Sequence, residues 1–139
     1  MSLKSVSKAD PNFVPNYQLA GIPFVTSSMS TEVDTTPIRV EFPYVTKSIT
    51  VHNIGTDDLK FGFTENGVKG VETANYFILH SHNSNFSDIP VTLDVRCKEL
   101  WFLKAGSNAT GFSVYAALTP ITGSDFPVLT GSVGFSGIG

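Results

Sequence analysis

Apolar and polar residues alternate one by one in several short stretches, and this pattern constrains the fold of the chain more than any other feature. The apolar members of the clearest stretches are Ile38, Val40 and Phe42; Leu59, Phe61 and Phe63; Val91, Leu93 and Val95; and Phe112, Val114, Ala116 and Leu118. Successive side chains of a strand point to opposite faces of a sheet, so each stretch predicts a strand with one buried face. Several such strands at short spacing predict an all-β sandwich or barrel.

The turns between these stretches favour a particular kind of sandwich. Strands are expected over residues 22–27, 37–42, 45–53, 59–64, 75–80, 89–95, 99–104 and 111–119. Residues 53–58 contain Asn, Gly and Asp and predict a hairpin turn, and Asn66-Gly67 predicts another tight turn. The connection 27–36 is long enough to cross between sheets. We therefore expect a single jelly-roll β-sandwich of about eight antiparallel strands, with extended N- and C-terminal arms.

The two ends of the chain differ from its middle. The chain has 139 residues, which predicts one domain, and the jelly roll is expected over 21–119. Residues 1–20 contain Pro11 and Pro15 and predict an extended N-terminal arm. Residues 120–139 form a Gly-rich, apolar C-terminal tail, and Asp125 is the one charged residue from 105 onward. This tail either packs on the chain's own core or is buried against a neighbouring subunit.

Charge and cysteine content restrict the function classes. The formal net charge is -3, which provides no basic field for nucleic acid, and no apolar run is long enough for a membrane span. Residues 1–8 lack the apolar core of a signal peptide. Cys97 is the only cysteine, so no disulfide forms within the chain, and a reducing compartment is expected.

No set of residues predicts catalysis, so the chain is expected not to be an enzyme and to have no catalytic, cofactor-binding or metal-binding residues. His80 and His82 lie two apart on one expected strand face, and with His52 they would offer the ligands of a cupin-like metalloenzyme. No Asp, Glu or Cys supports them at a suitable spacing, and an exposed strand end is favoured. Arg96 and Lys98 flank Cys97 and would lower its thiol pKa, but no histidine base is assigned, so a structural cysteine is favoured.

The candidate functional residues are therefore those of a surface. Trp101 lies in a strand that is apolar on both faces, which predicts a central strand or a subunit contact. Both arms add apolar side chains that need a partner. The candidate subunit interface consists of Phe13, Tyr17, Trp101, Ile121, Phe126, Val128, Leu129, Val133 and Phe135.

Several short segments of the sequence resemble those of a known family. These segments are Gly-Ile-Pro-Phe-Val-Thr-Ser at 21–27, Ile-Arg-Val-Glu-Phe-Pro-Tyr-Val-Thr at 38–46, Ile-Thr-Val-His-Asn-Ile-Gly at 49–55, Phe-Gly-Phe-Thr-Glu-Asn-Gly at 61–67, Asn-Tyr-Phe-Ile-Leu at 75–79 and Glu-Leu-Trp-Phe-Leu at 99–103. In amino-acid sequence and strand order these segments resemble the small single-jelly-roll capsid proteins of large icosahedral DNA viruses, especially those of algae. The resemblance covers residues 21–119.

The resemblance implies a structural virion protein. It points to the pentameric vertex (penton) protein of an icosahedral capsid, which would be located in the virion and assembled in the host cytoplasm. The implied partners are further copies of the chain, as a homopentamer, and neighbouring capsid proteins. The alternative is a minor capsid or decoration protein, or a receptor- or glycan-binding jelly-roll module of a virus or phage, for which an exposed Trp101 or Tyr115 is expected.

Overall fold

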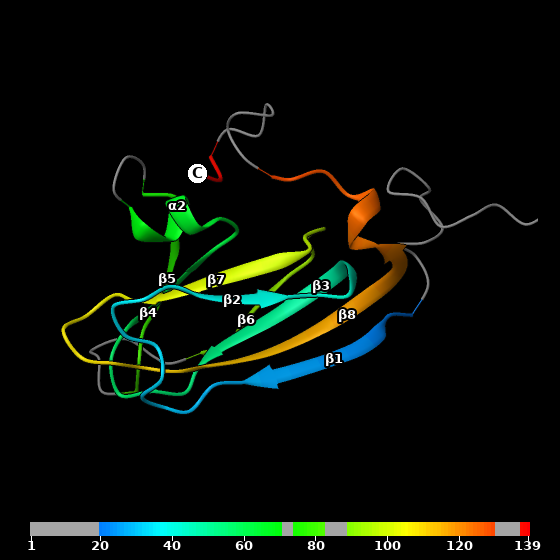
Figure 1. Cartoon of the computed structure of the whole chain (residues 1–139). Helices are drawn as coiled ribbons and strands as arrows, with labels where there is room; N and C mark the ends of the chain where they lie inside the picture. Colours follow the sequence, from blue (N-terminus) through cyan, green and yellow to red (C-terminus); the bar gives the residue numbers. More distant parts are fainter. Residues whose placement is uncertain (1–19, 71–73, 83–88, 130–136) are drawn as a thin grey trace, which may run out of the picture.

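The computed structural model describes residues 20–70, 74–82, 89–129 and 137–139 (Figure 1). Within these residues the chain is almost entirely strand and turn. Its strands are β1 (Ile22–Ser27), β2 (Ile38–Glu41), β3 (Tyr44–Asn53), β4 (Leu59–Gly62), β5 (Phe77–Leu79), β6 (Val91–Leu93), β7 (Glu99–Lys104) and β8 (Phe112–Thr122). Two short helical segments, α2 (Glu65–Lys69) and the 3₁₀ turn η2 (Gly123–Asp125), complete the described elements. Neither segment has the length that a membrane-crossing helix needs.

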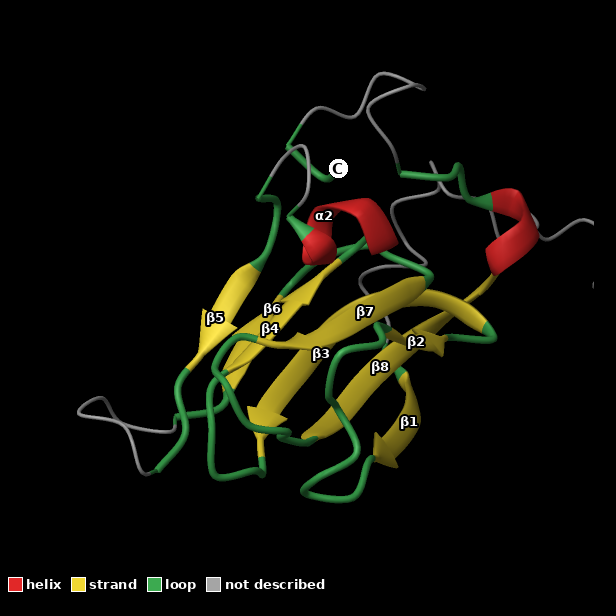
Figure 2. Cartoon of the chain, turned by 60° about the vertical axis from the view of Figure 1, so that its left-hand side comes forward, coloured by secondary structure: helices red, strands yellow, loops and turns green. Residues whose placement is uncertain are grey.

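The strands form two four-stranded antiparallel sheets. Sheet A has the order β1-β8-β3-β6, and sheet C has the order β2-β7-β4-β5. Figure 2 shows β1 and β2 at one side of the molecule and β5 and β6 at the other. The first strand thus pairs with the last, the second with the seventh, the third with the sixth and the fourth with the fifth. The all-β sandwich expected from the sequence is confirmed, while its classification as a jelly roll stays a prediction.

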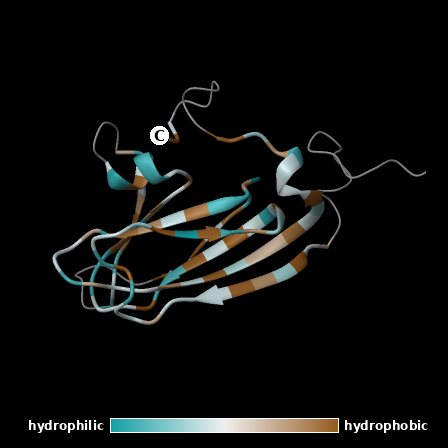
Figure 3. Ribbon diagram, viewed as in Figure 1, coloured by the Kyte–Doolittle hydropathy of each residue, from teal (hydrophilic) through white to brown (hydrophobic). Residues whose placement is uncertain are grey.

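The core lies between the sheets and follows the period-two pattern. On β3, Ile49 and Val51 are fully buried, whereas Thr50 between them and His52 after them are partly exposed. Apolar and polar colours alternate along the strands in Figure 3. Phe102 of β7 and Phe112 of β8 stack with ring centroids 4.0 Å apart, which joins sheet C to sheet A. Burial of these apolar faces is the main stabilising term of the sandwich.

The structure departs from the expected turn at Asn66-Gly67. Residues Glu65–Lys69 form helix α2 instead, and the Thr64 hydroxyl caps it by accepting a hydrogen bond from the Gly67 N–H at 3.0 Å. A threonine at this position satisfies one of the free N–H groups of a first helical turn. The left-handed residue that a tight turn needs is found one turn later, at Gly70, where φ is 67°. The prediction of a tight turn at Asn66-Gly67 was therefore wrong, because the cap by Thr64 stabilises a helical turn there instead.

Strand β8 extends further than the pattern predicted. It runs to Thr122 rather than ending at 119, and Ile121 is fully buried. The last partner of β8 in β1 is Leu118, so Pro120 lies where the strand has lost that neighbour. A proline is tolerated at such a position because no ladder bond is lost there. The boundary predicted between the domain and its tail is thus too early.

Candidate functional site

The structure describes five of the nine residues predicted for a subunit interface. Phe13, Tyr17, Val133 and Phe135 lie outside the described residues. The other five occupy three different environments. Trp101 is on sheet C, Ile121 and Phe126 are buried near the end of β8, and Val128 and Leu129 follow them. The predicted residues therefore do not form one surface.

The prediction for Ile121 and Phe126 is wrong, because the chain itself covers both side chains. Together with Val45 they form a second hydrophobic cluster, against which Leu129 also packs. Hydrogen bonds hold this segment in place. The Thr119 hydroxyl donates to the carbonyl of Val45 at 2.7 Å, and the Lys98 Nζ donates to the carbonyl of Phe126 at 3.1 Å. Residues 120–129 belong to the sandwich, and of the described tail residues only Val128 is a large, well-exposed hydrophobic residue.

The last three residues also contact their own chain. The Thr64 hydroxyl donates to the carbonyl of Ile138 at 2.8 Å, which places the C-terminus beside α2 (Figure 1). Gly67 permits this approach, because a Cβ there would overlap the Ile138 carbonyl and lie 2.9 Å from that of Asn75. Of the two alternatives for the tail, packing on its own chain applies to its described parts.

Trp101 lies on the outer face of sheet C. Its register partners are Arg39 on β2 and Gly62 on β4. The ring is partly buried, and its Nε1 is shielded from solvent without a hydrogen-bond partner among the residues described. Such a ring does not provide the exposed stacking surface that a glycan site requires.

The histidines do not come together as metal ligands in the described part of the chain. His80 Nδ1 lies 3.2 Å from a carboxylate oxygen of Asp58, and the second oxygen of that carboxylate accepts the N–H of Ser81. Among the residues that the structure describes, no group of three His, Cys, Asp or Glu side chains is close enough to hold a metal ion. The His80–Asp58 contact fixes the end of β5 against the turn after β3.

Cys97, for which the sequence favoured a structural role, belongs to the hydrophobic core. Its side chain is buried, and burial raises the pKa of the thiol to about 11. The Thr46 hydroxyl lies 3.4 Å from Sγ, accepts the Cys97 N–H at 3.0 Å and donates to the carbonyl of Val95 at 2.7 Å. Flanking cations do not activate this thiol because its desolvation dominates.

A polar network that the sequence patterns did not predict ties the loops at one end of the sandwich. The buried Asn53 amide donates to the carbonyls of Asp57 and Leu79, and its oxygen accepts from Gly55 N–H and the Thr110 hydroxyl. The Asp57 carboxylate in turn accepts the N–H groups of Asn108 and Asp58, which lowers its pKa. Every polar atom of the Asn53 amide is thus used within the chain, so this network is structural.

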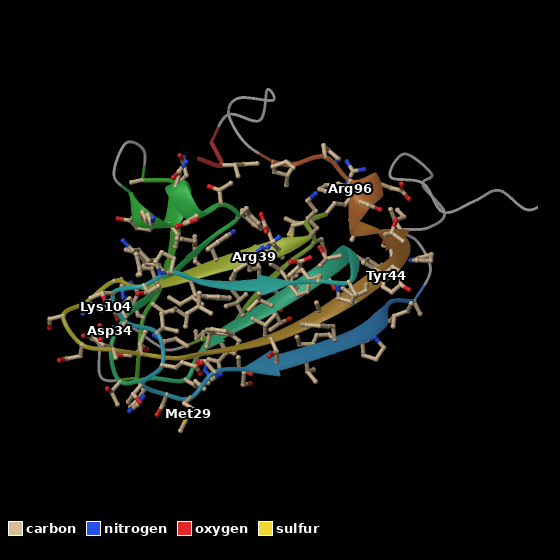
Figure 4. The ribbon with its side chains drawn as sticks, viewed as in Figure 1. Met29, Asp34, Arg39, Tyr44, Arg96 and Lys104 are labelled. Carbon is tan, nitrogen blue, oxygen red and sulfur yellow. The ribbon has the colours of Figure 1, made fainter. Side chains whose placement is uncertain are left out.

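The most distinctive surface is the outer face of sheet A. One row across it consists of Val25, Tyr115, Thr50 and Thr92, which are register partners on β1, β8, β3 and β6. The flanking rows contribute Pro23, Ala117 and Ser48 on one side and Ser27, Ser113 and His52 on the other. These three rows contain no Lys, Arg, Asp or Glu. The outer face of sheet C differs, since Arg39 there pairs with Glu41 and Glu99 (Figure 4).

These three uncharged rows on the outer face of sheet A were not predicted as a candidate site. The signal is present in the alternation, because the outward positions of three predicted strands are all uncharged. Val25 and Tyr115 are well exposed, and the neighbouring hydroxyls pair with one another, Thr50 with Thr92 at 2.9 Å and Ser27 with Ser113 at 2.8 Å. The hydroxyl pairs reduce the cost of removing this face from water.

Comparison of the chain with models of known protein families gives no match, and comparison with curated proteins gives none either.

Proposed function

We propose that this chain is a structural subunit of an icosahedral viral capsid, a single jelly roll of which five copies form a ring at the vertex. The observation that carries the proposal is the strand order β1-β8-β3-β6 and β2-β7-β4-β5. Pairing of first with last and second with seventh strand is what results when two Greek keys fold into two packed sheets. The sequence segments over 21–119 that resemble capsid jelly rolls support the same proposal.

The edge of sheet A adds support for a subunit that functions in an assembly. Among the residues that the structure describes, β1 is an edge strand of sheet A. Its six residues include no charged side chain, and Val25 on it is 73% exposed. Proteins that act alone block such edges with lysine, bulges or covering segments, because an open edge pairs with other chains. Only 15% of the residues are charged, against about a quarter in an average domain. An assembly that covers β1 accounts for both features.

The first experiment is the mass of the purified chain in solution, by light scattering after size exclusion over a range of concentrations. The ring predicts a species of five times the 14.9 kDa of one chain, and negative-stain images should show five-fold rings. A chain that stays monomeric at every concentration contradicts the ring. That result would favour the second candidate.

The second candidate is a receptor- or glycan-binding jelly roll, and one observation favours it. Tyr115 is 47% exposed at the centre of the outer face of sheet A, and Thr50 lies beside it. An exposed aromatic ring among hydroxyl groups can stack on a sugar ring. Screening the protein on a glycan array, with Tyr115→Ala as the matched control, tests this function. Binding that Tyr115→Ala abolishes would support it, and an array without a positive glycan would contradict it.

A further inference from the structure

Most of the exposed large apolar side chains among the described residues lie at two opposite sides of the sandwich, while Tyr44 and Val128 belong to neither group. We define the β1 patch as Ile22, Val25, Met29 and Tyr115, and the β5–β6 patch as Phe77, Ile78 and Ile89. The strand orders place β1 at one edge of sheet A and β6 at its other edge, with β5 at the edge of sheet C on the β6 side. Figure 2 shows this separation. Neither patch contains a charged residue, so neither needs an oppositely charged partner.

The two patches differ in shape. A partly open hollow of about 350 Å³ adjoins the β5–β6 patch between the sheet edges, and its walls include Phe61, Phe63, Tyr76, Val91 and Leu93. The β1 patch instead protrudes. Met29 is 75% exposed in the loop after β1, and Figure 4 shows it at the rim of the molecule, pointing outward. A methionine side chain is flexible enough to enter an irregular apolar hollow.

The apolar area of the patches fits one side each of a protein interface. From the exposed fractions of its four side chains, the β1 patch offers on the order of 400 Å² to solvent. The three side chains of the β5–β6 patch offer on the order of 300 Å², and the hollow adds to it. A stable interface buries about 800 Å² per partner, of which somewhat more than half is apolar. Each patch therefore provides most of the apolar area that one partner contributes.

We propose that the β1 patch of one copy packs against the β5–β6 patch of the next copy, with Met29 seated in the hollow. The inference rests on the proposed self-assembly and names the surfaces that carry it. Two unlike patches on one subunit make a heterologous contact, which repeats from copy to copy and closes into a ring when the rotation permits. A symmetric contact between two β1 patches would leave the β5–β6 patch of both copies in water.

Two charge-introducing variants test this pairing, one for each patch. Val25→Asp and Ile89→Asp change side chains that are 73% and 71% exposed, so both variants should remain folded. Asn66→Asp is the matched control, because it adds the same charge at an exposed position on α2, outside both patches. Native mass spectrometry and light scattering measure the assembly of each variant alone and of equal mixtures, and circular dichroism verifies the fold.

The wild-type chain and Asn66→Asp should assemble, while Val25→Asp and Ile89→Asp should each be monomeric. An equal mixture of the two should form a dimer with one copy of each, because Val25→Asp keeps its β5–β6 patch and Ile89→Asp keeps its β1 patch. That dimer should not grow, since its two remaining patches are the altered ones. A symmetric contact between two like patches would not give two monomeric variants that form a dimer only when they are mixed.

Three results would overturn the inference. Either variant assembling as the wild type does would show that its patch is not needed. Dimers formed by Ile89→Asp alone would indicate a symmetric contact between β1 patches. A mixture that stays monomeric while the wild type assembles would show that the two patches do not meet, and it would leave the proposed function intact. A wild-type chain that never assembles contradicts the proposed ring itself.

Discussion

Replacing Ile121 with alanine should destabilise the sandwich, although the residue lies in a segment that the sequence pattern assigns to a tail. Ile121 is fully buried and packs with Val45 and Phe126. Large-to-small substitutions of buried isoleucine cost about 2–5 kcal/mol, through lost transfer free energy and the cavity left behind. This cluster is small and close to the surface, where neighbours can relax, so we expect about 3 kcal/mol. That is a large share of a total stability of roughly 5–15 kcal/mol.

Urea unfolding followed by tryptophan fluorescence measures the effect directly, because Trp101 is the only tryptophan and lies on β7. With a denaturant slope of roughly 1–3 kcal/mol per molar urea, the transition midpoint should fall by about 1–3 M. Val128→Ala is the matched control from the same segment. Val128 is 54% exposed, so its truncation should change the free energy of unfolding by less than about 0.5 kcal/mol.

Equal midpoints for Ile121→Ala, Val128→Ala and the wild type would refute the reasoning, since they would mean that the end of β8 adds nothing to the core. Two truncations give an independent measurement. A chain ending at 119 loses Ile121 and Phe126 of the second cluster, leaves Val45 uncovered, and should be largely unfolded. A chain ending at 129 keeps the cluster, loses the hydrogen bond from Thr64 to Ile138, and should lose only about 0.5–1.5 kcal/mol for it.

Three further predictions concern buried or bonded polar groups. Thr46→Val should lower the free energy of unfolding by about 1–3 kcal/mol, measured by urea unfolding, because it leaves the buried N–H of Cys97 without its acceptor. Native Cys97 should react with iodoacetamide at pH 8 about 100-fold more slowly than a thiol of ordinary pKa, since a pKa of about 11 instead of 9.0 lowers the thiolate population by that factor; a native rate equal to the rate in urea would contradict burial. The folded-state pKa of Asp57 is lowered by hydrogen bonds from backbone N–H groups, so its carboxylate stabilises the fold above its unfolded-state pKa, and this contribution is lost as the pH falls through the folded-state pKa. Urea midpoints of the wild type and Asp57→Asn should therefore differ at pH 7 and converge in strong acid, and a difference that is independent of pH would contradict the assignment.

The strands themselves could be predicted because their signal is local. The local sequence places β1 and β7 at the residues where the structure has them, 22–27 and 99–104. The end of β8 could not be predicted, because Pro120 is a strand breaker unless the neighbouring strand has already ended, and the register with β1 is a property of the fold. Helix α2 was missed for a similar reason, since Asn66-Gly67 favours a turn and only the cap by Thr64 reverses the preference.

For the predicted interface residues, the sequence does not determine whether their own chain or a neighbouring subunit covers them. Apolar residues without a period, such as Ile121 and Phe126, indicate that something must cover them, but hydrophobicity is non-directional and does not distinguish the same chain from a neighbour. The register of the sheets settles this, because it carries β8 past Leu118 and over Val45. The same register joins Val25 and Tyr115, 90 residues apart, into one uncharged row, which neither strand reveals alone. The surface proposed here for self-assembly is thus a product of strand order.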